Sequence, residues 1–97
     1  MENNVYFHVT SPNHSKAVIV IGREKYTVKA NTDPLIVTMP VGKMNQVKIK
    51  AVKDFLNAVG GNKTYVKEIF IPNEETITDV FISIGKAIVT IDIKPRG

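Results

Sequence analysis

Histidine, serine and carboxylate side chains are the groups of this chain whose chemistry would suit catalysis or metal binding. The chain has two histidines, His8 and His14, and no cysteine. A protein zinc site needs at least a third ligand, and no suitably spaced carboxylates accompany these histidines. The serines lie outside any Gly-x-Ser-x-Gly turn, and no carboxylate pair shares an apolar segment that would favour general acid catalysis. We therefore predict no catalytic residue, no metal site, no cofactor and no enzymatic activity.

The lysines show a clearer pattern, because six of them and a single aspartate fall between residues 43 and 67. Lys48 and Lys50 are two residues apart, so on a strand they share one face and can contact anionic groups together. Tyr65 adds a ring of the kind that stacks on nucleic-acid bases. The residues that we predict to bind an anionic partner are Lys43, Lys48, Lys50, Lys53, Lys63, Lys67 and Tyr65. The alternative is that these lysines only keep a strand face soluble and block edge pairing.

The segment that follows has the opposite charge. Residues 68–92 contain five carboxylates and one lysine, within a chain whose net charge is +4. In the folded protein the basic and acidic segments either neutralise each other as neighbours or form opposite poles that guide association.

Strands must position these side chains, since apolar and polar residues alternate in short runs along most of the chain. Val5, Phe7 and Val9 begin the pattern, whereas residues 17–21 are apolar throughout, which is typical of a strand covered on both faces. Turn-forming Gly, Pro, Asn and Asp separate the runs. We expect strands at residues 5–10, 16–21, 26–30, 35–39, 46–52, 64–71, 76–84 and 87–94.

Two segments do not fit this pattern. Residues 53–59 have helical spacing of their apolar side chains, which leaves a single helical turn and an irregular loop as alternatives, and residues 95–97 are expected to form a tail. Seven to eight strands separated by regular turns predict an all-β fold, an antiparallel β-sandwich. A barrel has the same alternation and remains the alternative.

Composition limits the classes of protein further. A chain of 97 residues suits one domain, residues 1–97, and the lack of cysteine excludes a disulfide framework. The longest apolar run, residues 17–21, is too short to span a bilayer, so we predict no membrane insertion. Residues 1–4 lack the features of a signal peptide, and the location is left open between cytoplasm, virion and bacterial cell surface.

Turn residues follow one another in an order that resembles a known family. The segments are Ser-Pro at 11–12, Ala-Val-Ile-Val-Ile-Gly-Arg at 17–23, Asp-Pro-Leu at 33–35, Met-Pro-Val-Gly-Lys at 39–43 and Ile-Pro-Asn-Glu-Glu-Thr at 71–76. This order resembles the PEGA family, small β-sandwich domains of bacterial surface and multidomain proteins. It is similar also to transthyretin-like and other immunoglobulin-like modules. The resemblance implies a non-catalytic module for binding or scaffolding.

We therefore expect a binding or structural module that contacts a protein or a polysaccharide through edge strands and loops. The first alternative is an accessory or decoration protein of a phage virion, and the second is an OB-like barrel that binds nucleic acid through the basic strand face. Self-association is also expected. Phe81 and Ile88 lie opposite the apolar rows of their strands, so each is buried either under a second layer or in a subunit contact.

Overall fold

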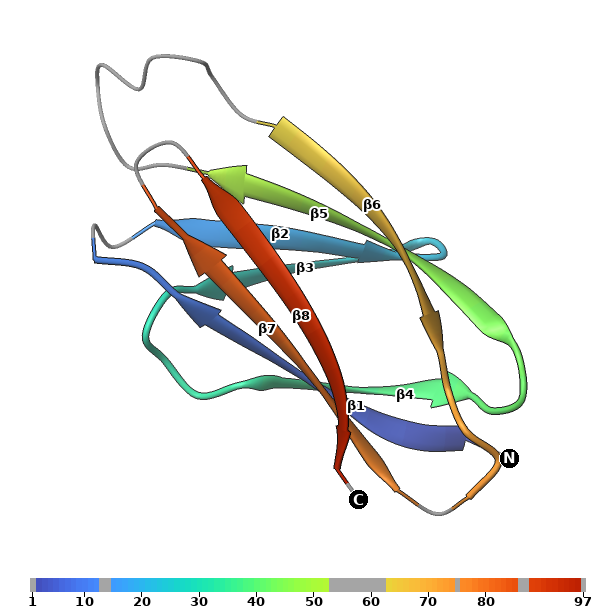
Figure 1. Ribbon diagram of the computed structural model, residues 1–97. Helices are drawn as coiled ribbons and strands as arrows, with labels where there is room; N and C mark the ends of the chain where they lie inside the picture. The colour runs from blue at the N-terminus through green and yellow to red at the C-terminus, as the bar shows by residue number, and fades with distance from the viewer. Residues whose placement is uncertain (1, 13–14, 53–62, 75, 86–87, 97) are drawn as a thin grey trace.

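The computed structural model describes residues 2–12, 15–52, 63–74, 76–85 and 88–96, and these form eight β-strands in two sheets (Figure 1). The strands are β1 Glu2–Thr10, β2 Lys16–Ile21, β3 Glu24–Lys29, β4 Leu35–Pro40, β5 Met44–Val52, β6 Lys63–Phe70, β7 Ile77–Ile84 and β8 Val89–Arg96. The prediction of an all-β fold is confirmed, with a strand at each of the eight expected places. Residues 53–59, for which a helical turn was one alternative, lie outside the described residues.

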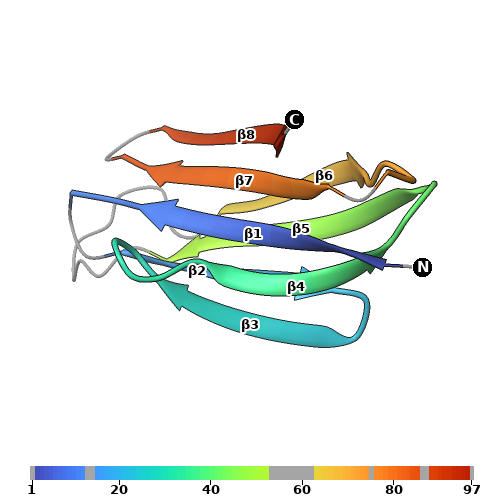
Figure 2. The same ribbon diagram turned by 90° about the horizontal axis from the view of Figure 1, so that it is seen from below.

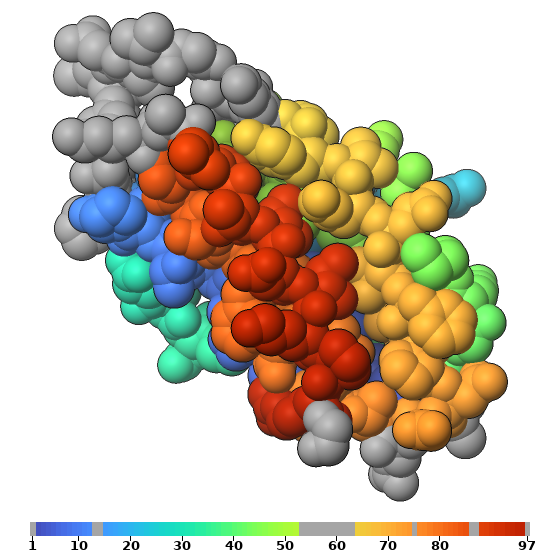
Figure 3. All heavy atoms as spheres, viewed as in Figure 1, coloured from blue at the N-terminus to red at the C-terminus, as the bar shows by residue number. Residues whose placement is uncertain are grey.

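Each sheet has four strands. Sheet A has the order β4-β1-β7-β8 and sheet B the order β3-β2-β5-β6, and Figure 2 shows sheet A in front of sheet B. Figure 3 shows the side of the sandwich where the edge strands β8 and β6 form neighbouring parts of the surface. The described strands thus form two separate sheets rather than one closed barrel.

One strand pair corrects the expectation of a wholly antiparallel sandwich. Strands β1 and β7 run parallel, with Val5 opposite Thr78 and Thr10 opposite Ser83, whereas the other five pairs are antiparallel. Parallel neighbours need a long crossover connection. The chain provides one, because five strands separate β1 from β7 in sequence: β2 and β3 in sheet B, β4 at the edge of sheet A, and β5 and β6 in sheet B.

The core lies between the inner rows of the two sheets. Phe7 of β1, Val80 of β7, Ile19 of β2 and Ile49 of β5 are fully buried there. Strand β8 contributes partly buried Val89, Ile91 and Ile93. Burial of this kind stabilises a fold by about 25 cal/mol per Å² of apolar surface, so the inner rows fix which face each strand turns outward.

The C-terminal strand ends later in the sequence than expected. Residues 95–97 were predicted as a tail, but β8 continues through Pro95 and Arg96, and Arg96 pairs with Ile77. Proline is tolerated here because β8 is an edge strand, where a missing N–H need not break a ladder. The extension matters because it brings the Arg96 side chain onto the outer face of sheet A.

Two glycines adopt the left-handed backbone conformation that favours glycine. Gly22, in the β2–β3 turn, has φ +61° and nothing within 4 Å of the position that a Cβ would occupy. Gly42, in the β4–β5 turn, has φ +75°, and its Cβ would lie 2.6 Å from Oδ1 of Asn73. The N–H of Gly42 also donates to the carbonyl of Ile71 across 2.7 Å, so this turn is packed against the segment that leaves β6.

The two turns give a test of the fold. Gly22→Ala should lower the free energy of unfolding by about 1 kcal/mol, the conformational penalty of a left-handed backbone. Gly42→Ala should lower it by a similar amount, because the atom that its methyl group would overlap is the end of the exposed Asn73 side chain, which can rotate away. Urea unfolding of both variants measures the two losses, and a stability unchanged by either substitution would contradict the left-handed backbone at that turn.

Candidate functional site

The outer face of sheet B carries a set of lysines from three adjacent strands. Ala17 and Ile19 of β2 are buried in the core, so Lys16, Val18 and Val20 alternate onto the outer face. The same alternation places five lysines on that face: Lys16 of β2, Lys25 and Lys29 of β3, and Lys48 and Lys50 of β5. These five lysines together with Val18 and Val20 are called the basic face below.

Strand register arranges the lysines around the two valines. Val20 lies between Lys25 on β3 and Lys48 on β5, and Val18 has Lys50 beside it on β5. Beyond Val18, Lys16 lies opposite Lys29 and closes one end of the row. The result is a floor of two half-buried valines bordered by ammonium groups on both sides and at one end.

The surface is hollowed at this place. One hollow of about 230 Å³ is lined by Val18, Val20, Lys25, Lys48, Lys50 and Thr64. A neighbouring hollow of about 390 Å³ shares Val20 and Lys48 and extends past Gly22 to Lys43 and Met44. The two hollows together form a shallow groove that follows β2 and β5.

No ion pair to a lysine of the basic face is recorded among the described residues. Within the described part of the chain, the structure records ion pairs only between Asp79 and the side chains of His8 and Arg96, on the other sheet. Glu68 of β6 lies opposite Gln46 of β5 and is the carboxylate in the strands of sheet B that shares the outer face. Among the described residues, the outer face of sheet B therefore carries more positive than negative charge.

The structure separates the residues that the sequence grouped together. Lys48 and Lys50 are on the basic face, and Lys43 lines the adjoining hollow. Tyr65 and Lys67 lie opposite Ile49 and Val47, so they belong to the inner row of edge strand β6 and not to the basic face. Lys53 lies outside the described residues, and Lys63 is described only by its backbone pairing with Ala51.

Three lysines of the basic face were absent from the prediction. Lys16, Lys25 and Lys29 lie far from residues 43–67 in sequence and reach the face because β2 pairs with both β3 and β5. The signal that identifies them is the tight turn at Gly22, which sets the register of the β2–β3 hairpin. With that register, the period of two places Lys25 beside Val20 and Lys29 beside Lys16.

Strand β2 is also less covered than expected. Its apolar run predicted a strand covered on both faces, but Val18 and Val20 are only half-buried and no second layer covers them in the described structure. The neighbouring lysines explain how such a row stays soluble, since their methylene stems can cover apolar surface while the ammonium groups stay in water.

Most of the basic segment and most of the acidic segment lie in different sheets. Strand β5 and the lysines of β6 belong to sheet B, and β7 and β8, from the acidic segment, belong to sheet A. Glu68 of the acidic segment is an exception, because it lies on β6 in sheet B. The carboxylates of β7 and β8 are on the other sheet from the basic face.

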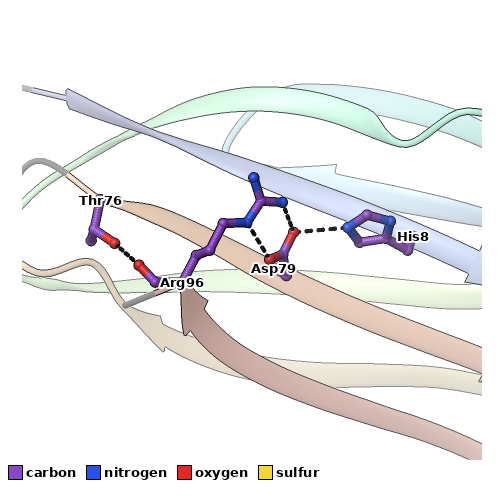
Figure 4. Close-up of polar contacts among 4 residues, drawn as sticks. All are labelled: His8, Thr76, Asp79 and Arg96. Atoms are coloured by element: carbon purple, nitrogen blue, oxygen red, sulfur yellow. Dashed lines mark hydrogen bonds and ion pairs between the residues drawn. The ribbon is translucent and has the colours of Figure 1, made fainter.

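A second polar cluster occupies the outer face of sheet A. Asp79 of β7 lies between His8 and Arg96 (Figure 4). Nε2 of His8 donates to Oδ1 of Asp79 across 2.9 Å, and Arg96 donates from Nε and Nη2 to the two carboxylate oxygens at 3.0 and 2.7 Å. The hydrogen bonds from Arg96 hold the pKa of Asp79 below its usual value, although partial burial opposes this shift and the His8 bond adds to it.

Aromatic rings surround this cluster. The His8 ring stacks on Phe81, with ring centroids 4.7 Å apart and planes at 15°. Tyr6 lies two residues before His8 on β1, and the centroids of these two rings are 6.4 Å apart. The guanidinium of Arg96 lies 5.1 Å from the centre of the Tyr6 ring, a cation–π contact. Because every charged group of the cluster has a partner, the cluster stabilises the sheet rather than presenting unpaired charge.

The two residues predicted as a subunit contact are exposed. Phe81 is 40% exposed on the outer face of sheet A, and Ile88, just before β8, is 68% exposed. Neither is covered by a second layer within the described structure, so the alternative that they belong to the core does not apply. Ile36 of β4, 53% exposed, shares the outer face with Phe81.

The described residues contain no group of three or more His, Cys, Asp or Glu side chains that could hold a metal ion. They also contain no helix long and apolar enough to cross a membrane. Searches against protein families, curated proteins and solved structures find no match to this chain.

The Asp79 cluster predicts how stability changes with pH. The folded pKa of Asp79 is lower than the unfolded value of about 3.9. Its ion pair therefore stabilises the fold above that value and loses its effect as the pH falls through the folded pKa. At pH 7 the urea midpoint should be higher for the protein with Asp79 than for the Asp79→Asn variant. This difference between the two midpoints should shrink below about pH 4.

Both proteins should carry His8→Gln, so that titration of the imidazole does not contribute to the comparison. A difference that stays constant or grows as the pH falls would contradict the ion pair between Arg96 and Asp79.

Proposed function

We propose that this protein is a non-catalytic binding module that holds an anionic macromolecule on the basic face of sheet B. The observation that carries the proposal is the ring of five lysines around Val18 and Val20, without a recorded ion pair among the described residues. The sequence predicted contacts through edge strands and loops, and the proposal places the main contact on a sheet face instead. An immunoglobulin-like or PEGA-like sandwich, the fold family that we propose, suits such a module.

The composition of the basic face indicates what kind of anion it would bind. All five of its cations are lysines, which act as point charges and lack the planar fork with which arginine recognises single phosphates or carboxylates. The affinity of such a face depends more on the density of negative charge along a partner than on any single phosphate or carboxylate group. Its valine floor adds apolar contact, which a protein partner or the apolar side of a polysaccharide would use.

Nucleic acid fits this face less well. Binding of single strands usually combines a basic groove with exposed aromatic rings on which bases stack. Tyr65 and Tyr26 belong to inner rows and Tyr6 lies on sheet A, so no tyrosine reaches the basic face. The aromatic residue on the outer face of sheet B is Phe70, opposite Met44 at the far end of β5.

Charge reversal tests the proposed function directly, with poly-L-glutamate as the anionic probe. Lys48→Glu should weaken binding of the probe at least tenfold, since it removes a cation and adds a repelling charge in the middle of the face. Lys94→Glu makes the same change on the outer face of sheet A and should leave the affinity within about twofold. Isothermal titration in low salt measures both, and binding should weaken steeply as salt is added. Equal losses in the two variants would refute the assignment to the basic face.

A second candidate function is a self-associating component of a larger assembly, such as a virion. Exposed Phe81 and Ile36 on the outer face of sheet A favour it, because this face carries charges of both signs and does not repel its own copy. The basic face would repel a second basic face, so a contact between equivalent surfaces of two copies would use sheet A.

Light scattering after size-exclusion chromatography tests this candidate. If copies associate through sheet A, Phe81→Asp should lower the molar mass. Phe70→Asp should not, although Phe70 on sheet B is the more exposed of the two phenylalanines, at 54% against 40%. Circular dichroism shows whether each variant remains folded. A monomeric parent protein, or equal effects of the two substitutions, would rule out the contact.

A further inference from the structure

We propose that the occupant of the basic face is an acidic amphipathic helix of a partner protein, lying along β2. This inference rests on the proposed function and names the partner that the same face would take. Four features of the face carry it: the spacing of its apolar floor, the width between its lysines, its charge, and the lack of an aromatic ring beside the lysines among the described residues.

The apolar floor matches the repeat of a helix. Val18 and Val20 are two residues apart on one strand, about 6.8 Å along β2, and both are half-buried at the bottom of the hollow. Apolar residues four positions apart on a helix are separated by about 6 Å along its axis. Two successive side chains of an amphipathic stripe can therefore rest on the two valines together.

The distance between the lysine rows matches the width of a helix. Lys25 on β3 and Lys48 on β5 lie on either side of Val20, two strand spacings or about 9.6 Å apart at the backbone. An α-helix with its side chains is about 10 Å wide. Carboxylates that flank the apolar stripe of a helix above β2 would face Lys25 on one side and Lys48 and Lys50 on the other.

Other occupants fit these features less well. An added β-strand would pair with the free edge of β3 or β6 and leave the basic face uncovered. A second copy of this chain would have to offer an acidic helix, and its described residues form strands and loops without a helix. A nucleic acid would leave the valine floor facing a charged backbone, and the described residues place no aromatic ring beside these lysines on which to stack a base.

The test is an NMR titration of the isotopically labelled protein, which maps even weak contacts residue by residue. The first probe is a synthetic helical peptide of about 18 residues, with leucine on one stripe and glutamate on both flanks. The second has the same composition in an order that scatters the leucines around the helix. Poly-L-glutamate and an oligothymidylate serve as anions without an apolar stripe.

We expect the striped peptide to shift the amide signals of β2 and its neighbours β3 and β5, and to bind at least tenfold more tightly than the scattered peptide. The double variant Val18→Thr/Val20→Thr keeps β-branched side chains and should reduce affinity for the striped peptide about tenfold. It should leave binding of poly-L-glutamate within about twofold, because the lysines are intact.

The outcomes separate the helix from the general function. If poly-L-glutamate shifts the basic face but the two peptides bind equally, the proposed function stands and the helix is wrong. Tighter binding of the oligothymidylate than of the striped peptide would assign the face to nucleic acid and overturn the inference. If no probe shifts the basic face, both the inference and the proposed function fail.

Discussion

The packing of two inner rows of side chains is the interaction on which the rest of this structure depends. Each strand has two rows, and the shared core can bury only one of them. Ile19 of β2, Ile49 of β5, Phe7 of β1 and Val80 of β7 are fully buried between the sheets. A slip of one residue in any strand would turn its apolar row to water. The core therefore also fixes the outer rows, and with them every side chain that a partner can reach.

The two outer faces handle charge in different ways. On sheet A, Asp79 is held by His8 and Arg96, and the Tyr6 and Phe81 rings pack beside these groups. These three side chains are therefore paired with one another. On sheet B the lysines of three strands border Val18 and Val20, and no ion pair to them is recorded in the residues that the structure describes. A face with unpaired charge around an apolar floor is suited to a partner that brings both carboxylates and apolar side chains.

Local pattern predicted more of the fold than of the site. Alternation, together with the apolar run at residues 17–21 and the turn residues between the runs, located all eight strands, because these signals depend only on neighbouring residues. The members of the basic face depend on pairing between distant strands: Lys25 and Lys29 reach it through β2, and Tyr65 misses it because its row faces inward. Arg96 was expected in a tail, since nothing in three terminal residues shows that β8 pairs as far as Ile77. The parallel pairing of β1 and β7 is likewise a matter of topology and leaves no local signal.

The most direct test of the central claim is a lysine footprint. The folded protein is acetylated briefly with and without poly-L-glutamate, and mass spectrometry measures the modification of each lysine. The account predicts that the polymer protects Lys16, Lys25, Lys29, Lys48 and Lys50, while Lys94 on sheet A and Lys67 on the inner row of β6 react as before. Protection spread evenly over all lysines, or centred on Lys94, would contradict the assignment of the binding surface to sheet B.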